Sequence, residues 1–325
     1  MGRRDTAILN AAAATAKMAG EHAQPNIPTA SVHNLDDEAL KDPRLRIIEA
    51  DPAGGKVVID ADNRVFILAV PQPAGEKEWK KVTEDASTAV DNAAKEIFGP
   101  NYNQEVPTSQ EPTPFAMHDS VRNICAALFM NAAILRLLGF ANCLSQTYAP
   151  RLYVHYFEVM TVLLRWNAAL FPLCALSNCV FASATFNFGP RTVTFPHLHS
   201  LNLAWGWCFI TALGWFNHEL GGHLILWDLW LIIEFLPGMA IAIPSAIFRH
   251  SNVSIQQDEK RFSITQYTSA GVFSFVNNGF KTNVTLEQET SKEEARAWAD
   301  AAKVRCVEGV KMYLTLDELR QRAFM

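Results

Sequence analysis

The sequence lacks an excess of basic residues. Its 325 residues carry 28 Lys and Arg against 33 Asp and Glu, which gives a formal net charge of −5. Because affinity for nucleic-acid phosphates comes chiefly from Lys and Arg, this balance argues against non-specific wrapping of nucleic acid, although it leaves room for a local basic groove. Hydrophobic residues at 49% and charged residues at 19% are typical of a globular protein, and the length is enough for one large core or two modest ones.

Paired cysteines are also missing. No C-x-x-C pair and no metal-type spacing occurs among the six cysteines, which are Cys125, Cys143, Cys174, Cys179, Cys208 and Cys306. In a chain of this length such a pattern predicts reduced, mostly buried thiols of an intracellular protein.

Long apolar runs are absent as well, and we expect no secretory leader. The segment 1–20 holds Arg3 and Arg4 but then only an alanine-rich polar stretch, without the hydrophobic run of a secretory signal. The most hydrophobic region, 203–248, is interrupted by acidic residues, Asn217 and prolines, so it falls short of the roughly 18 uninterrupted apolar residues of a membrane helix. We expect a soluble, intracellular protein with no membrane partner.

The order of patterns along the chain predicts three parts. Residues 1–44 are polar and lack periodicity, so we expect a flexible N-terminal arm. Residues 45–117 form a small strand–helix unit and loop: strands at 45–49, 56–60 and 64–70 precede an amphipathic helix over 76–98. Residues 118–325 form the third part.

This third part begins with helical patterns over 119–138 and 150–170 and then changes character. Short apolar and β-branched runs punctuated by Gly and Pro follow, which is typical of a sandwich or barrel. The expected strands are 185–188, 192–195, 206–213, 223–227, 231–235, 239–243 and 262–267. A helix over 291–310 and a capping box at Thr315 close the pattern. The sequence therefore predicts an α+β fold in which helices cover one outer face of a β-barrel.

Three histidines within this β-rich part have the spacing of a metal site. His197 and His199 are separated by one residue, and His250 follows the strand-like run 239–248. Side chains two apart on an extended segment point to the same side. The layout is that of a mononuclear Fe(II) site in a double-stranded β-helix oxygenase, where two imidazoles and one carboxylate leave positions open for substrate and O₂. His199 stands where such a site needs an aspartate.

An arginine completes the constellation. Arg261 begins the strand after His250, where a guanidinium can clamp a dicarboxylate with two parallel hydrogen bonds. The alternative is a solvated hairpin charge, which its charged neighbours 258–260 partly support. Arg249 competes for the role, but adjacent strand residues face opposite sides, so it should point away if His250 points inward.

Other candidates have simpler explanations. A single histidine such as His155 or His218 is more often a hydrogen-bonded structural residue than a ligand. Tryptophans at 205, 207, 215, 227 and 230 have two interpretations. They could sandwich a flipped base, but we favour packing of a small barrel core.

Several long strings in the sequence resemble one family. They are 187–197 (NFGPRTVTFPH), 202–208 (NLAWGWC), 221–228 (GGHLILWD), 243–246 (IPSA), 249–252 (RHSN) and 265–268 (TQYT). In this order they are similar to the oxygenase domain of the TET/JBP-like Fe(II)/2-oxoglutarate dioxygenases, in their fungal expansion, over roughly 119–319.

This resemblance implies a double-stranded β-helix, or jelly roll, that binds Fe(II), 2-oxoglutarate and O₂. Characterised relatives oxidise the 5-methyl group of a pyrimidine in DNA or RNA, which would make the protein nuclear if its substrate is DNA. By position, His197 and His250 take the two histidine ligand roles, and Arg261 takes the 2-oxoglutarate carboxylate. His199 falls where the family carries its aspartate, so it is the third candidate ligand.

That substitution leaves three outcomes open. A neutral imidazole supplies neither the negative charge nor the compact oxygen ligand of aspartate. The chain is then a working dioxygenase with a three-histidine site, a metal-binding but inactive relative, or a folded shell without iron. The last two would be catalytically degenerate modules that bind nucleic acid or a partner protein.

Overall fold

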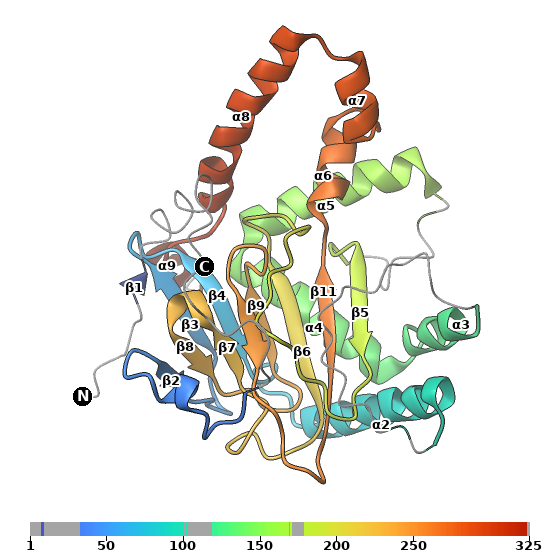
Figure 1. Ribbon diagram of the computed structural model, residues 1–325, viewed down its shortest axis with the longest axis vertical. Helices are drawn as coiled ribbons and strands as arrows, with labels where there is room; N and C mark the ends of the chain where they lie inside the picture. Colours follow the sequence, from blue (N-terminus) through green and yellow to red (C-terminus); the bar gives the residue numbers. More distant parts are fainter. Residues whose placement is uncertain are drawn as a thin grey trace.

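Two β-sheets pack against each other at the centre of the molecule, and helices cover the outer face of the larger one (Figure 1). The computed structural model describes residues 8–9, 33–100, 102, 119–168, 170 and 179–323. The seven-stranded sheet has the order β1 (Ile8–Leu9), β3 (Lys56–Asp60), β4 (Val65–Val70), β9 (Ala240–Ile243), β6 (Cys208–Trp215), β11 (Lys260–Tyr267), β5 (Ser183–Asn187). The four-stranded sheet has the order β10 (His250–Asn252), β7 (Leu224–Leu226), β8 (Leu231–Ile233), β2 (Arg46–Ile48).

From β5 onward the chain passes repeatedly between the two sheets. After β5 it crosses to the four-stranded sheet, where His197 pairs antiparallel with His250 of β10. It returns to the large sheet as β6, crosses again for β7 and β8, and then alternates through β9, β10 and β11. The segments 183–187 and 197–267 therefore enclose a common interior, which receives side chains from both sheets.

The strand β11 shows how this interior is divided from the helical side. Phe262 and Ile264 pack with helix residues in one apolar cluster, so the even-numbered side chains face outward to the helices. Since side chains alternate along a strand, Arg261, Ser263, Thr265 and Tyr267 face the interior between the sheets. All but Tyr267 of these residues are buried.

Eight α-helices lie among the described residues. They are α2 (Trp79–Phe98), α3 (Asp119–Leu128), α4 (Ala132–Tyr148), α5 (Pro150–Trp166), α6 (Ala270–Asn277), α7 (Asn283–Glu289), α8 (Lys292–Val310) and α9 (Leu316–Ala323), with short 3-10 turns η1 (Glu38–Lys41) and η3 (Trp227–Leu229). Apolar residues of α2, α3 and α4 pack on Phe186, Leu213 and Phe262 of the large sheet. The predicted helical layer on one outer face is confirmed for this sheet.

The single helix expected over 119–138 is wrong. It is two helices, because the Asn131 side chain accepts hydrogen bonds from the backbone N–H groups of Ala133 and Ile134 and so caps a new helix. The sequence patterns also missed α6 and α7, and α2 begins at Trp79 rather than at residue 76. The capping box predicted at Thr315 is present, and the structure adds another at Ser291, at the start of α8.

The strand expected over 192–195 is also absent. The Asn252 side chain takes the place of a strand partner there: its Oδ1 accepts from Thr194 N at 2.9 Å and its Nδ2 donates to Thr192 O at 3.0 Å. Pro196, which has no N–H, further prevents a regular ladder. The strand β10, which supplies Asn252, bears out the strand position assumed for His250, although the sequence patterns gave no bounds for it.

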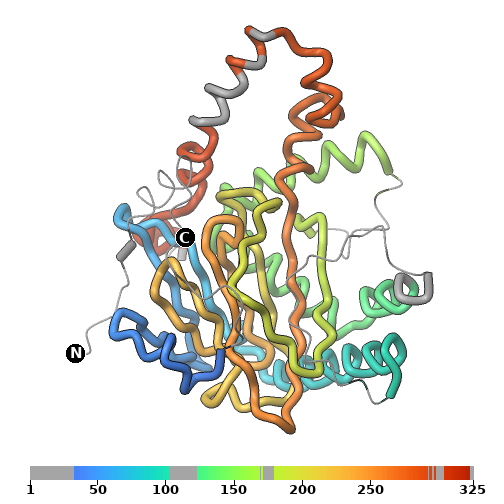
Figure 2. The backbone as a smooth tube through the Cα atoms, viewed as in Figure 1, coloured from blue at the N-terminus to red at the C-terminus, as the bar shows by residue number. Residues whose placement is uncertain are grey.

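The N-terminal strands join the two sheets rather than standing apart. The strand β4 pairs with β9, far away in the sequence (Figure 2), and β2 pairs with β8. The segment 35–45, most of which belongs to the predicted arm, packs against the four-stranded sheet. Its Leu40 lies in one apolar cluster with Ile225, Trp227 and Ile232. The rest of the arm, apart from 8–9 and 33–34, and most of the loop 101–114 lie outside the described residues. The division at 44/45 and 117/118 stays a prediction.

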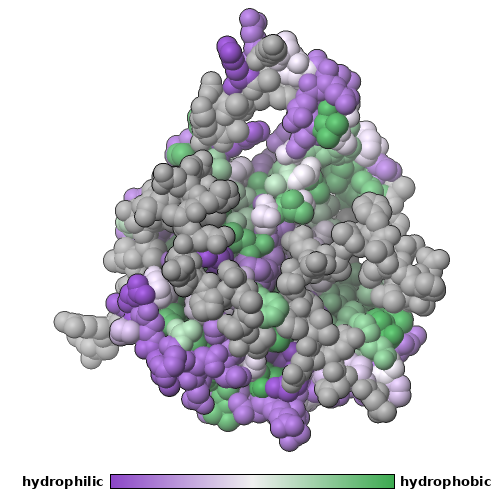
Figure 3. All heavy atoms as spheres, viewed as in Figure 1, coloured by the Kyte–Doolittle hydropathy of each residue, from purple (hydrophilic) through white to green (hydrophobic). Residues whose placement is uncertain are grey.

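The helices α6, α7 and α8 form an arch at one end of the molecule. Figure 3 shows an opening beneath this arch in the space-filling view, and no buried residue is found in α7. Among the described residues, no helix has both the length and the apolar character required to cross a membrane.

Candidate metal centre and anion site

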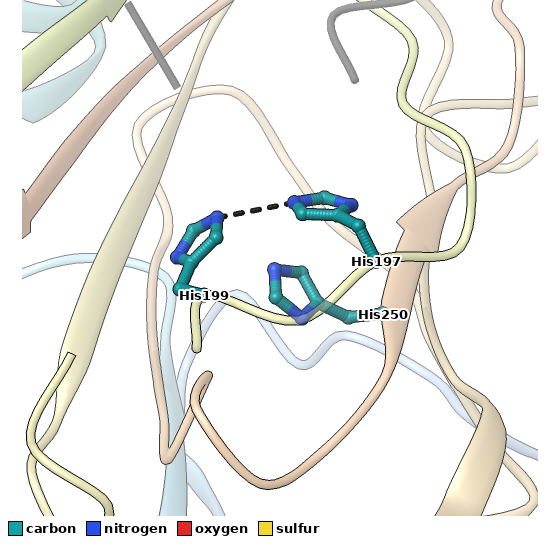
Figure 4. A group of neighbouring side chains, drawn as sticks. All are labelled: His197, His199 and His250. Carbon is teal, nitrogen blue, oxygen red and sulfur yellow. Dashed lines mark hydrogen bonds between the residues drawn. The ribbon is translucent and has the colours of Figure 1, made fainter. Parts of the chain in front are cut away.

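Three imidazole rings converge at the edge of the four-stranded sheet (Figure 4). His197 and His250 lie on paired backbone segments, with each N–H donating to the other's carbonyl at 3.0 Å. The backbone N–H of His199 donates to Ser245 O at 3.0 Å, which anchors the third ring to the loop before β10. The structure thus brings together all three histidines predicted from the sequence.

The rings lie close enough to share one ion. Their centroids are 4.4 Å apart for His197 and His250, and 4.9 Å apart for each pair that includes His199. One nitrogen from each ring lies within 4.8 Å of the other two, and the Nε2 atoms of His197 and His199 are 3.1 Å apart. No carboxylate belongs to this group.

Backbone carbonyls fix the orientation of two rings. The Nδ1 of His197 donates to Phe195 O at 2.7 Å, and the Nδ1 of His250 donates to Phe248 O at 3.0 Å. Because a carbonyl only accepts, both Nδ1 atoms carry the proton, and in the neutral rings both Nε2 atoms carry lone pairs. A hydrogen bond from the other ring nitrogen to a backbone carbonyl is the usual way in which a metal-binding histidine is oriented.

Burial keeps the rings of His199 and His250 neutral. It lowers the pKa of His199 to about 4, with the neighbouring His197 as a smaller cause. Burial, followed by His197 and His199, also holds the pKa of His250 well below its usual range. Metal ligands must be unprotonated, so both rings can act as ligands at neutral pH.

The donor set fits a divalent transition metal. Two nitrogens bound at right angles to a metal about 2.1 Å away would be about 3.0 Å apart, close to the separation observed between His197 and His199. Imidazole suits iron, zinc, copper and nickel alike, so the set indicates the class of metal and not one element.

Arg261 lies in the interior and is not the solvated hairpin charge considered as its alternative. Its residue exposure is 2%, and burial lowers its pKa to about 10, so it stays cationic at neutral pH. Nη1 donates to Thr192 O at 3.1 Å, Nε has no partner among the described atoms, and the guanidinium lies 5.6 Å from the Phe235 ring centroid. No carboxylate of the described residues forms an ion pair with it. A buried cation with an unpaired donor is suited to bind an anion.

Two glycines allow neighbouring backbone to approach Arg261 closely. Gly214 lies opposite Arg261 on β6, and a Cβ there would lie 2.1 Å from Lys260 O. Gly222, at a φ of +76°, packs against the Arg261 side chain. The next residue, His223, is 3% exposed and its Nδ1 lacks a described partner. Burial lowers the pKa of His223, while Glu234 acts in the opposite direction and Arg261 contributes a smaller lowering.

A hydrogen-bonded path links the arginine to the histidines. Thr192 O accepts from Arg261 Nη1 and from Asn252 Nδ2, and Asn252 lies on the same short strand as His250. The inward face of β11 adds Ser263, which accepts from Asn187 Nδ2 at 2.8 Å, and Tyr267, whose ring centroid lies 6.4 Å from that of His199. The interior is therefore polar along this wall.

As site residues, sequence patterns missed His223, Ser263 and Asn252. For His223 the signal was available, since two glycines before a histidine mark a close approach of backbone to another group. For Asn252 and Ser263 a signal was available as well: each lies two positions after a predicted site residue, His250 or Arg261, on the same strand and therefore shares its face.

The competing residues lie elsewhere. Arg249 forms an ion pair with Asp228 at 2.8 Å and faces away from the histidine cluster, as expected. His218 pairs with Glu234 at 2.7 Å, and His155 stacks on Phe273. Trp207 and Trp227 are core residues at 1% and 5% exposure, as the packing interpretation expects, whereas Trp215 is exposed at 42%.

Comparison with known proteins finds distant likenesses only. No family model and no curated protein matches the chain. One similar solved structure is NgTET1 in complex with 5mC DNA, with a TM-score of 0.38 and 16% identity over 71% of this chain and 84% of that one. Another is the viral collagen prolyl hydroxylase of Paramecium bursaria Chlorella virus-1 in its 2OG complex, with a TM-score of 0.22 and 11% identity over 35% of this chain and 70% of that one.

Proposed function

We propose that this protein is an Fe(II)/2-oxoglutarate-dependent dioxygenase whose core is a double-stranded β-helix. The observation that carries the proposal is the pairing of three converging imidazoles with a buried arginine that has no acidic partner among the described residues. One group can hold a metal cation and the other an anion, and both face the interior of one barrel.

Strand order supports the double-stranded β-helix. Counting the His197 segment, eight strands from β5 to β11 alternate between two four-membered layers, in the orders β9-β6-β11-β5 and β8-β7-β10-His197. A jelly roll is built from two Greek keys with this kind of alternation.

In this proposal His197, His199 and His250 hold Fe(II), and Arg261 binds the distal carboxylate of 2-oxoglutarate. The bound metal and cosubstrate would supply the oxidative decarboxylation of 2-oxoglutarate by O₂ to succinate and CO₂, with one oxygen atom passed to the substrate. His223 and Ser263 lie beside Arg261 and would add hydrogen bonds to the same anion.

The chain's own contribution is orientation and exclusion of water. Phe195 and Phe248 carbonyls hold two rings with Nε2 toward the centre. Burial keeps His199 and His250 neutral without any proton being removed at neutral pH. Burial of Arg261 away from water strengthens its attraction for a carboxylate.

For the substrate we propose the 5-methyl group of a pyrimidine in nucleic acid. Its support is the resemblance of the ordered strings between 187 and 268 to the TET/JBP-like family. A net charge of −5 gives no independent support. The substrate is therefore tested both as an oligonucleotide and as the free 5-methylpyrimidine nucleoside.

A second candidate function is a catalytically degenerate binding module. His199 favours it, because the cluster lacks the carboxylate of the usual iron triad. Such a module would keep the interior anion site and lose turnover.

Anaerobic titration separates the two. Adding Fe(II) and 2-oxoglutarate should produce the weak visible charge-transfer band of the ternary site, and admitting O₂ should release succinate. Oxidised pyrimidine measured by mass spectrometry identifies the substrate. If no band appears and no succinate forms with any 5-methylpyrimidine substrate, the dioxygenase proposal is wrong and the binding module is favoured.

A further inference from the structure

The ring of His199 is held differently from its two neighbours. His197 and His250 each donate from Nδ1 to the carbonyl of the residue two positions earlier. In His199 the Nδ1 instead faces the Sγ of Cys208 at 3.8 Å. This contact joins the third candidate ligand to a thiol on the central strand β6.

Proton positions follow from these partners. With both rings neutral, Nε2 of His197 carries a lone pair, because its Nδ1–H is committed to Phe195 O. The Nε2 of His199 lies 3.1 Å away, and two lone pairs repel at that distance. A positive centre must therefore lie between them, either a proton on His199 Nε2 or a metal ion bound by both.

The two arrangements, a proton or a metal ion between the Nε2 atoms, require opposite hydrogen-bonding roles of Cys208. If His199 Nε2 carries the proton and donates to His197, its Nδ1 is a lone pair and accepts from the Cys208 S–H. If both Nε2 atoms bind a metal, the proton of neutral His199 is on Nδ1 and donates to Cys208 Sγ. A thiol serves in both arrangements because it is a weak donor and a weak acceptor, whereas a carbonyl accepts only.

The scaffold keeps the thiol in place for this exchange. Cys208 is 1% exposed, and its strand is paired with β9 on one side, where it opposes Ile243, and with β11 on the other. The position of its Sγ beside His199 is therefore fixed by two ladders.

We propose that Cys208 is a positioning residue for His199, a reversible hydrogen-bond partner that lets this ring change from a donor toward His197 to a metal ligand. The inference rests on the metal centre of the proposed function. It concerns the tautomer of one ring and changes neither the ligand set nor the cosubstrate.

The tautomer itself is the first measurement. Long-range ¹H–¹⁵N spectra of histidine-labelled protein at pH 8 should show the His199 proton on Nε2 without metal and on Nδ1 with Zn(II), assigned by its loss in His199→Ala. A His199 proton that stays on Nδ1 under both conditions would overturn the inference.

Metal affinity supplies the second measurement, made by Co(II) titration with its visible spectrum. Cys208→Ala should weaken Co(II) binding about tenfold, which is the typical effect of removing a hydrogen-bond partner of a metal-bound histidine. Cys208→Ser, which donates and accepts, should stay within about threefold of wild type. In a His199→Ala background Cys208→Ala should have no further effect.

The two proposals fail in different ways. If His250→Ala binds Co(II) as well as wild type, or if wild type binds none, the metal centre is wrong and the inference falls with it. If the centre binds metal but Cys208→Ala weakens it equally with and without His199, the thiol only packs and the inference alone is wrong. Should Cys208→Ala not fold, the serine variant and the wild-type spectra still decide.

Discussion

The interior between the two sheets has two polar ends, and they differ in the charge of the ligand that each can bind. At the histidine end, three buried rings present nitrogen donors with no carboxylate among them. At the arginine end, a buried guanidinium has a carbonyl partner and an unpaired Nε but no described acid. One end is complementary to a cation and the other to an anion, and burying either group without its complement is costly. The contrast favours two ligands bound in one interior over a purely structural polar core.

The largest expected effect is at the histidine end. His197→Ala or His250→Ala should lower the affinity for Fe(II), or for Mn(II) as a surrogate, by about 100-fold or more, because each removes an oriented nitrogen ligand. Isothermal titration under anaerobic conditions measures the change. His155→Ala, which alters a ring stacked on Phe273, is the matched control and should bind metal normally. Unchanged affinity in both ligand variants would exclude this metal site.

The arginine end should respond to a different ligand. Arg261→Gln should raise the Kd for 2-oxoglutarate about 10- to 100-fold, since charge-assisted bonds to a carboxylate are lost. Arg261→Lys keeps the positive charge but not the forked geometry of the guanidinium. Its Kd for 2-oxoglutarate should lie between those of the wild type and Arg261→Gln. Metal affinity measured without 2-oxoglutarate should not change in either variant.

Arg249→Gln is the control arginine. It breaks a partly exposed ion pair with Asp228 and should leave the 2-oxoglutarate Kd as it is. Equal losses in the Arg249 and Arg261 variants would show that binding depends on overall charge and would remove the anion site from the barrel interior.

Sequence patterns located these two ends better than they located the chain between them. The spacing of His197 and His199 on an extended segment predicted that both face one side, whereas His250 and Arg261 were assigned from their order along the chain and from the family resemblance. The segment 192–195 could not, because Asn252 replaces its ladder partner through side-chain bonds that link positions far apart in the sequence. The break before Asn131 was visible in principle as an N-cap residue within an apolar helical pattern.

His199 tests whether the histidine end is complete without a carboxylate. His199→Asp should restore the two-histidine, one-carboxylate face and raise succinate formation about tenfold, while His199→Ala should lower metal affinity. Wild-type turnover above that of the aspartate variant would show that the three-imidazole site is adapted to its metal. If neither variant changes metal binding or turnover, His199 is not a ligand.

The smallest effect on 2-oxoglutarate binding is expected at Glu234. This acid raises the pKa of His223, whereas Arg261 lowers it. Glu234 is already occupied: Oε2 accepts from Ala50 N at 2.6 Å and Oε1 accepts from His218 Nδ1 at 2.7 Å. Its neighbour Phe235 lies against the Arg261 guanidinium, and since adjacent side chains point apart, Glu234 points away from the guanidinium.

Glu234→Gln leaves one of the two donors without an acceptor and should lower the free energy of unfolding by about 1–2 kcal/mol in urea denaturation. The 2-oxoglutarate Kd should stay within about twofold, because the arginine is not neutralised by this acid. A marked tightening of 2-oxoglutarate binding would instead mean that Glu234 competes for Arg261, and the arginine end would then hold its own counter-charge.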